Sequence, residues 1–205
     1  MRAKFIEALQ KHQALFGLEI SDQKIERLAF YYELVAEHNP ILHLVAPCTP
    51  AEFATRHILE SLTILEYLPI NANFADVGSG AGLPSVPCLL VRDDLSAVLV
   101  ESKEKKAGFL QKVFAKCEVE SRAIVVNRQF SEIKKPDVSY ISCRALDKFQ
   151  QNLHRLIKWS DDCTLLFFGG PNLREGLQMS GFTLEERLMP LSEQRYLFVG
   201  RPSQK

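Results

Sequence analysis

No C-x-x-C pair occurs in this chain, although its 205 residues include five cysteines. They are Cys48, Cys88, Cys117, Cys143 and Cys163. An odd number of widely spaced cysteines indicates neither a disulfide framework nor a zinc site. His38 and His43 lie on either side of Pro40, without the further ligands that a metal site needs. We therefore expect a cytoplasmic protein with reduced thiols and no metal ion.

Long apolar runs are missing as well. No run reaches the length that spans a membrane, and the first residues lack the apolar core of a signal peptide. Internal repeats and low-complexity segments are also missing. With 46% hydrophobic residues, the sequence predicts one domain with an appendage and no membrane partner.

The chain has no excess of either charge, because 25 Lys and Arg residues balance 25 Asp and Glu residues. Binding of a nucleic acid would therefore depend on a local basic patch. The densest patch contains Lys103, Lys105, Lys106, Lys112 and Lys116, with Arg122 and Arg128 following in sequence. A solvated helix face explains these lysines equally well, so both interpretations stay open.

The most informative segment that is present runs from Phe74 to Pro84 and reads FADVGSGAGLP. A short apolar strand leads directly into the alternating glycines Gly78, Gly80 and Gly82. This pattern predicts a tight turn at the end of a parallel strand, where bare backbone meets a cofactor. The alternative is a glycine turn that serves tight packing alone.

The glycine spacing favours one kind of cofactor. Dinucleotide-binding turns read G-x-G-x-x-G, whereas here the third glycine comes one residue earlier and Leu83 takes its place. The G-x-G-x-G form resembles the first motif of methyltransferases that depend on S-adenosylmethionine (SAM). Pro84 and Pro87 fit the first turn of a helix over 84–91, where a missing amide hydrogen costs nothing.

Glu101 ends the next apolar run, about twenty residues after the glycines. Nucleotide-binding α/β folds place a carboxylate at this distance to accept both hydrogen bonds of a ribose diol. A solvated glutamate that caps the following helix is the alternative. This spacing does not separate a methyltransferase from a dehydrogenase, since both bind an adenosine ribose.

The spacing of apolar residues changes near residue 73. Before it, helical periodicity predicts helices over 2–16, 22–38 and 50–68, the last opened by a capping box at Thr49 and Glu52. After it, strands are predicted over 74–78, 97–101, 122–126, 138–143 and 163–168, with helices near 84–91, 103–117 and 148–159. Strands over 182–188 and 196–200 suit an antiparallel hairpin added to a parallel sheet.

The expected fold is therefore α/β, with a Rossmann-like and mostly parallel sheet. We expect one domain over 1–205, in which a helical N-terminal extension over 1–70 packs on a core over 71–205. His57, in the third predicted helix, is interpreted as a hydrogen-bonded packing residue that holds this extension against the sheet.

Ligands of a doubly wound sheet lie at the carboxyl ends of its strands. The fourth strand ends in Ser142-Cys143-Arg144-Ala145, which is not the Asp or Asn followed by Pro-Pro and an aromatic that is typical of exocyclic-amine methyltransferases. Methylation at carbon 5 of a pyrimidine needs a cysteine nucleophile, and Cys143 is the candidate. The usual preceding proline and a second cysteine motif are absent, so a buried, unreactive thiol is the preferred interpretation.

Four segments together closely resemble the bacterial ribosomal RNA small-subunit methyltransferase G family, also called the glucose-inhibited division protein B family. They are the RHILESL run at 56–62, the glycine segment at 76–84, the Glu101-Ser102 and Lys105-Lys106 region with Phe109-Leu110, and Cys143-Arg144-Ala145. The resemblance extends from about residue 34 to about residue 200.

The resemblance implies a SAM-dependent methyltransferase that methylates N7 of a guanine in 16S ribosomal RNA of the small subunit. It implies that Gly78, Gly80 and Leu83 contact SAM and that Gln129 and Phe130 flank its adenine. It further implies that Arg144 reaches the cofactor or the RNA. No residue is assigned a catalytic proton transfer, because guanine N7 has a free lone pair. The protein is expected to be a monomer.

Departures from the family pattern keep other functions open. The family usually has an acidic pair such as Ala-Glu near 129–130 and Lys-Gly where this chain has Gly169-Gly170. The segment 38–43 likewise lacks the family's Trp-Asn and second Asn. The alternatives are a ribosome-assembly or RNA-binding factor without turnover and an NAD-dependent oxidoreductase.

Overall fold

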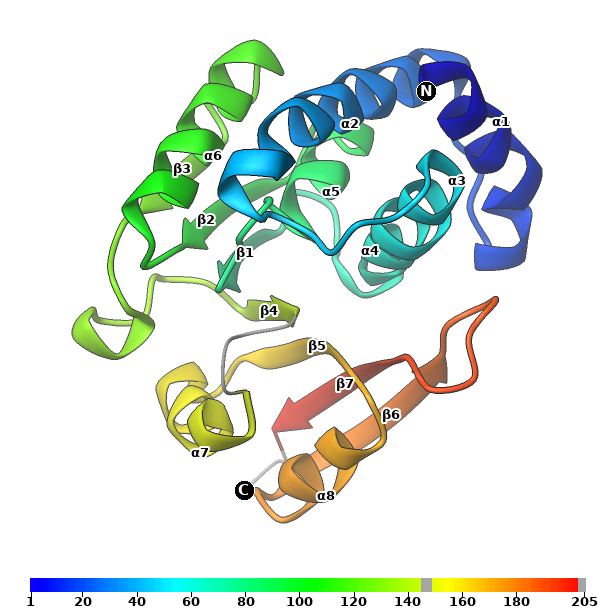
Figure 1. Cartoon of the computed structure of the whole chain (residues 1–205). Helices are drawn as coiled ribbons and strands as arrows, with labels where there is room; N and C mark the ends of the chain where they lie inside the picture. Colours follow the sequence, from blue (N-terminus) through cyan, green and yellow to red (C-terminus); the bar gives the residue numbers. More distant parts are fainter. Residues whose placement is uncertain (145–148, 203–205) are drawn as a thin grey trace.

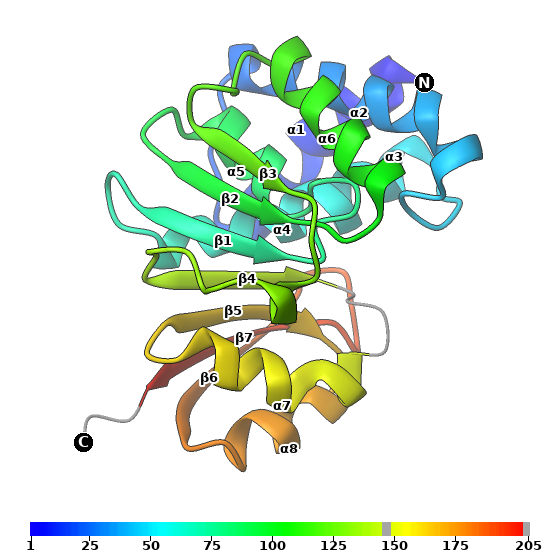
Figure 2. The same ribbon diagram turned by 90° about the vertical axis from the view of Figure 1, so that its left-hand side faces the viewer.

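A computed structural model that describes residues 1–144 and 149–202 has a single sheet of seven strands with helices on both faces (Figure 1). The strand order is β3-β2-β1-β4-β5-β7-β6, which can be followed from top to bottom in Figure 2. The strands are β1 (Asn73–Val77), β2 (Ser96–Val100), β3 (Ala123–Val126), β4 (Tyr140–Arg144), β5 (Thr164–Gly169), β6 (Phe182–Leu188) and β7 (Tyr196–Pro202). All seven predicted strands are confirmed to within about two residues at either end, as is the mostly parallel α/β class.

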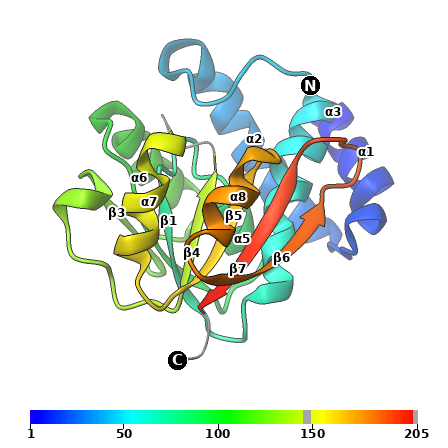
Figure 3. The ribbon, with the colours of Figure 1, turned by 90° about the horizontal axis from the view of Figure 1, so that it is seen from below.

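The C-terminal strands form the predicted antiparallel pair. Strands β1 to β5 are parallel to one another, whereas β7 runs antiparallel to both β5 and β6 (Figure 3). Because Tyr196 at the start of β7 pairs with Gly169 at the end of β5, the start of β7 lies at the carboxyl edge of the parallel strands. The topology therefore brings residues near 195 to the edge where a ligand is expected.

Crossover helices connect the strands. Three match the predicted helices: α5 (Ser85–Val91), α6 (Glu104–Lys116) and α7 (Phe149–Ser160). A short helix between β5 and β6, α8 (Asn172–Gln178), is not anticipated by the sequence. Its interior Gly176 weakens the helical signal, and a Cβ there would lie 2.4 Å from Leu153 Cδ2, so close packing on α7 accounts for the glycine.

The N-terminal extension is helical, as predicted. It contains α1 (Arg2–His12), η1 (Gln13–Phe16) and α2 (Asp22–Leu42). Helix α2 continues past Pro40, beyond the predicted end at residue 38, because a proline in the last turn removes only one hydrogen bond. His43, with a φ of 48°, then ends the helix by donating its amide to the Asn39 carbonyl.

The third predicted helix is a continuous run of four segments with three types of helical turn. It consists of α3 (Pro50–Glu52), η2 (Phe53–Leu59), α4 (Glu60–Leu62) and η3 (Thr63–Tyr67). The capping box is confirmed, since Thr49 Oγ1 accepts from the Glu52 amide and the Glu52 carboxylate accepts from the Thr49 amide. Segment η2 is a π-helix, in which the Glu60 amide donates to the Thr55 carbonyl five residues earlier. Such turns are rare and often occur at functional sites.

Two layers of buried side chains enclose the sheet. One layer joins the N-terminal helices, α5 and α6 to one face, and contains Phe5, Tyr31, Phe53 and Phe74. The other joins α7 and α8 to the opposite face. The helical extension thus shares its core with the sheet. Within the described ranges, every helix is too short or too polar to cross a lipid bilayer.

Gly82, the third glycine of the turn, lies where a side chain does not fit. Its φ is +96°, and a Cβ would lie 2.5 Å from Val86 Cγ2 and 3.0 Å from Leu110 Cδ2. We expect Gly82→Ala to lower the free energy of unfolding by about 2 to 3 kcal/mol, measured by urea denaturation. Gly108→Ala is the matched control, because a Cβ on that helical glycine meets nothing within 4 Å. Equal stability of the two variants would contradict the packing argument.

Candidate functional site

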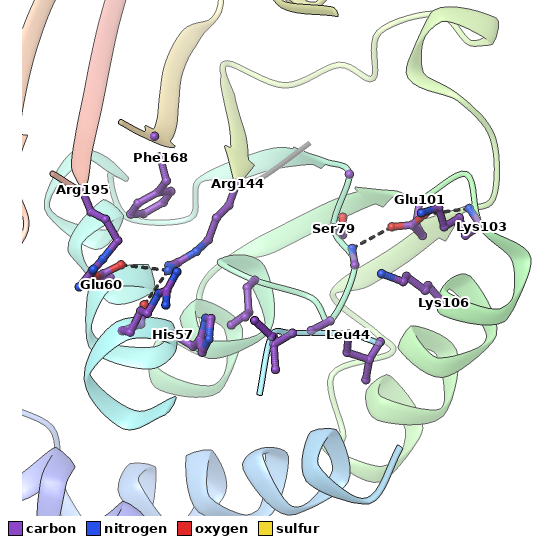
Figure 4. Close-up of a pocket in the computed structure, with 18 of the residues that line it drawn as sticks. Leu44, His57, Glu60, Ser79, Glu101, Lys103, Lys106, Arg144, Phe168 and Arg195 are labelled. Atoms are coloured by element: carbon purple, nitrogen blue, oxygen red, sulfur yellow. Dashed lines mark hydrogen bonds and ion pairs between the residues drawn. The ribbon is translucent and has the colours of Figure 1, made fainter. Parts of the chain in front are cut away.

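A cavity of about 470 Å³ opens at the carboxyl ends of the parallel strands. This is the size of a small-molecule pocket. Its walls come from the glycine turn after β1, the ends of β2, β4 and β5, the start of β7, and the helical extension. Figure 4 shows Glu101, Lys103 and Lys106 at one end and Arg144, Glu60, Arg195 and Phe168 at the other. The two ends differ in chemistry.

At the first end, Glu101 ties the glycine turn to helix α6. The carboxylate is buried, and Oε2 accepts from the Gly80 amide at 2.8 Å while Oε1 accepts from the Lys103 amide at 2.8 Å. Each carboxylate oxygen has a second lone pair, so both are able to accept a further hydrogen bond from a ligand. Glu101 thus both holds the turn and offers acceptors to the cavity.

The helical extension supports the glycine turn from outside. The hydroxyl of fully buried Tyr31, on α2, donates to the Ala81 carbonyl at 2.9 Å. Leu44, Val45 and Ala46, which follow α2, line the cavity beside the turn. Residues before the sheet therefore form part of the site as well as part of the core.

Beneath the turn, Asp76 is a fully buried carboxyl group on β1. Its Oδ1 accepts from Ser142 Oγ at 2.9 Å, and Oδ2 has no hydrogen-bond partner among the described residues. Burial raises the pKa of Asp76 from 3.8 to about 7, and the Ser142 hydroxyl opposes this rise. The group therefore titrates near neutral pH in the folded protein.

The free energy of unfolding of Asp76→Asn, compared with that of the wild type, is expected to increase as pH rises from 5 to 8. Between about pH 4 and 7 the folded wild type binds more protons than the unfolded chain, so its stability falls as pH rises. Asparagine has no such titration, and the difference between the two proteins grows by about 2 to 3 kcal/mol over this range. Denaturation at pH 5 and pH 8 measures it. An unchanged difference would contradict the raised pKa.

At the second end, Glu60 is a buried carboxylate, 2% exposed, between two arginines. Its Oε2 lies 2.9 Å from Arg144 Nη2, and its Oε1 lies 2.7 Å from Arg195 Nε. Arg144 Nη2 also donates to the Arg56 carbonyl at 2.6 Å, and its guanidinium lies 5.1 Å from the centre of the Phe168 ring. Arg144 is therefore held in a structural ion pair while it lines the cavity.

His57 stands beside this ion-pair cluster, on the π-helical segment. Its side chain is 9% exposed, its ring lies 5.1 Å from that of Phe53, and Nδ1 has no hydrogen-bond partner within the described ranges. Burial, followed by the charges of Arg144, Arg56 and Arg195, lowers the pKa of His57 to about 3. The burial of His57 agrees with the predicted packing role, and the predicted hydrogen bond is not made by Nδ1 among the described residues.

Five of the residues predicted to bind a cofactor line the cavity together: Gly78, Gly80, Leu83, Glu101 and Arg144. Gly78 and Gly80 have φ values of 74° and 55°, so the turn presents backbone without side chains to the cavity. The remaining glycine, Gly82, is not part of the lining and packs on α5 and α6 instead.

Gln129 and Phe130, predicted to flank the adenine, do not line the cavity. The Gln129 amide donates to the Glu132 carboxylate at 3.2 Å. The Phe130 ring is buried against Trp159, with 5.8 Å between the ring centres, because a short 3₁₀ turn directs it into the second core layer. Contacts of these two residues with a cofactor stay a prediction.

The preferred interpretation of Cys143 as a buried, unreactive thiol agrees with its complete burial on β4, whereas Ala145 lies outside the described residues. Arg122 does not belong to a free basic patch, because its guanidinium donates to the carbonyls of Arg92, Leu95 and Leu89. Lys106 is shared between the patch and the cavity, and its Nζ donates to the His43 carbonyl.

Several cavity residues have no role assigned from the sequence. They are Leu44, Val45, Ala46, Glu60, Arg195 and Tyr196. One signal was available for Glu60, which is an acid within the apolar RHILESL run. Arg195 and Tyr196 have none, since only the antiparallel pairing of β7 brings them to the site.

Among the described residues, no three His, Cys, Asp or Glu side chains are grouped so that they could hold a metal ion. The charges at the cavity are instead those of arginines, lysines and two buried carboxylates. Such a set binds organic and phosphate groups through hydrogen bonds and charge.

Solved structures of low sequence identity share the fold. The m1A22 tRNA methyltransferase TrmK of B. subtilis is 20% identical, with a TM-score of 0.56 over 70% of this chain and 65% of that chain. A precorrin-6y C5,15-methyltransferase of Geobacter metallireducens GS-15 is 14% identical, with a TM-score of 0.54 over 69% of this chain and 85% of that chain. At these identities the likeness concerns the fold alone.

Relatives of higher identity include proteins described as ribosomal RNA small subunit methyltransferase G. That of Azoarcus sp. (strain BH72) is 42% identical over 98 residues, or 48% of this chain and 46% of the relative. That of Desulforamulus reducens is 32% identical over 188 residues, or 84% of this chain and 76% of the relative. The chain therefore spans about half the length of the Azoarcus protein. It likewise spans 56% of the relative from Pelotomaculum thermopropionicum. The model of the family described as rRNA small subunit methyltransferase G matches residues 24–175, and the chain therefore belongs to this family.

Proposed function

We propose that this protein is a SAM-dependent methyltransferase that modifies N7 of a guanine in 16S ribosomal RNA of the small subunit. The observation that carries the proposal is the juxtaposition of the side-chain-free turn at Gly78 and Gly80 with buried Glu101 at one cavity, in a chain of this family. The relatives' names support ribosomal RNA as the substrate. The same proposal assigns the protein to the cytoplasm, where ribosomal subunits are found.

The residues at the cavity fit SAM. Backbone at Gly78 and Gly80 leaves room for an adenosine and its methionine chain, and Leu83 adds an apolar contact. The free lone pairs of Glu101 match a ribose diol. Arg144 offers a charged donor to the methionine carboxylate or to an RNA phosphate. When bound, SAM supplies an electrophilic methyl group.

The absence of an assigned proton-transfer residue agrees with the chemistry of guanine N7. This atom has an in-plane lone pair and carries no proton, so its methylation needs alignment and exclusion of water rather than a general base. The product base is cationic, which makes a nearby unpaired arginine unfavourable. Glu60 moderates this effect, since its carboxylate is paired with both Arg144 and Arg195.

The test incubates the protein and radiolabelled SAM with small subunits that lack the modification, and then maps the labelled nucleotide. Incorporation at N7 of one guanine supports the proposal. Label on another base would overturn the target, and subunit binding without incorporation would favour an assembly factor. Separate titrations with SAM and NAD complete the test, because a preference for NAD would indicate an oxidoreductase.

A further inference from the structure

The second end of the cavity holds more positive charge than its carboxylate balances. Three guanidinium groups line this end, those of Arg56, Arg144 and Arg195, and Glu60 is the acid among them, since Glu101 lies at the other end (Figure 4). Arg144 and Arg195 contact the two oxygens of the Glu60 carboxylate at 2.9 Å and 2.7 Å, so these two cations lie close together. Like charges that are partly removed from water repel each other, and the surplus therefore favours an anionic ligand.

The π-helical turn places Arg56 beside this pair. In an α-helix the Glu60 amide would donate to the Arg56 carbonyl four residues earlier, whereas here it donates to the Thr55 carbonyl. The Arg56 carbonyl accepts instead from Arg144 Nη2 at 2.6 Å. This bond ties the backbone of Arg56 to the end of β4, while its side chain is exposed and lines the cavity.

Arg56 and Arg195 have hydrogen-bond donors to spare. The Arg56 side chain has no hydrogen bond or ion pair within residues 1–144 and 149–202. In the same ranges Arg195 donates only through Nε, which leaves both of its terminal NH₂ groups without an acceptor. Arg144 Nη2, in contrast, is already engaged by Glu60 and by the Arg56 carbonyl. Guanidinium groups match the paired oxygens of a carboxylate or a phosphate.

Of the two substrates, the RNA suits this surplus of positive charge. SAM has a sulfonium and an ammonium group against one carboxylate, so it is itself a cation. RNA has one negative charge for each phosphate. We propose that Arg56 and Arg195 bind a backbone phosphate of the ribosomal RNA next to the target nucleotide, an inference that rests on the proposed function. Such a contact fixes the position of the RNA at the cavity without reading its sequence.

The test measures binding of the protein to small subunits that lack the modification, in the absence of SAM, from about 50 to 200 mM KCl. Arg56→Gln should weaken binding roughly 10-fold and reduce the slope of log affinity against log salt by about 0.7 to 0.9. Arg56→Lys keeps the charge and should restore the slope. Adding Arg195→Gln to Arg56→Gln should reduce the slope by a similar amount again. Calorimetric titration should show the same affinity for SAM in Arg56→Gln as in the wild type.

Arg201→Gln is the matched control, because it also removes one exposed guanidinium. Arg201 follows Gly200, which pairs with Leu165 near the start of β5, so it lies at the opposite edge of the sheet from the cavity. Its ion pair with Glu185 is exposed and contributes little to stability. This variant should bind subunits with the wild-type slope.

The outcomes separate the inference from the proposed function. A wild-type slope in Arg56→Gln overturns the phosphate contact, and no further decrease in a folded double variant overturns the part of Arg195. Weaker SAM binding with unchanged subunit binding would assign Arg56 to the methionine carboxylate and also overturn the inference. If the subunits bind with the expected slopes but receive no methyl group, the phosphate contact stands and the proposed function fails. If the wild type binds no subunits, both fail.

Discussion

Replacing Glu60 with alanine is expected to lower the free energy of unfolding by about 3 to 5 kcal/mol, which is the usual cost of removing one partner from a buried ion pair. Glu60 is 2% exposed and accepts from both Arg144 and Arg195. Its removal leaves two guanidinium groups at the cavity wall without an anion. The same change should abolish activity, because these arginines then repel each other at the proposed substrate site.

Urea denaturation of Glu60→Ala measures this cost. The matched control is Glu66→Ala, which breaks the ion pair between Glu66 and Arg187 at a carboxylate that is 65% exposed. Exposed pairs contribute little, so the control should stay within about 1 kcal/mol of the wild type. Arg144→Ala should be less destabilising than Glu60→Ala, because Glu60 keeps Arg195 as a partner. Equal effects of Glu60→Ala and Glu66→Ala would show that the buried cluster contributes nothing to stability.

Glu60 also illustrates what the sequence conceals. An acid on a helix ordinarily faces solvent, and the place of Glu60 within the RHILESL run is the one local signal of its burial. Its position depends on Arg144 at the end of β4 and on Arg195 just before β7, which are 84 and 135 residues away along the chain. Local periodicity carries no information about such partners.

The sheet, in contrast, could be predicted almost in full. Apolar runs of strand length, the three glycines and the capping box at Thr49 are local signals, and each is found where the sequence places it. The prediction failed at α8, where Gly176 serves contact with α7 rather than helix propensity. Phe130 shows the same limit, because an aromatic residue after a strand suits either a ligand or a core, and Trp159 is its neighbour here.

The cavity joins one predictable end to one that is not predictable. The Glu101 end follows from short-range spacing, since the acid and the glycines directly follow the paired ends of two adjacent parallel strands. The arginine end is assembled from the π-helical segment, β4 and the start of β7, which come together only in the folded protein. A cofactor class is thus easier to read from this sequence than the residues that meet the substrate.

The second large effect is expected at Glu101. In Glu101→Gln one carboxylate oxygen becomes an amide NH₂, which cannot accept from the Gly80 amide or the Lys103 amide and cannot accept from a ribose hydroxyl. Hydrogen bonds to a charged group contribute about 1.5 to 3 kcal/mol each, so the loss of the one to the ribose corresponds to roughly a 10- to 150-fold weaker affinity for SAM. Isothermal titration calorimetry measures this change.

Glu104→Gln is the matched control for this substitution, because Glu104 is an exposed acid in the first turn of the same helix. It should bind SAM within about twofold of the wild type. Circular dichroism melting of both variants separates loss of affinity from loss of fold. If Glu101→Gln folds and binds SAM as tightly as Glu104→Gln, the carboxylate serves only to tie the glycine turn to α6, and the ribose must be held by other groups at the cavity.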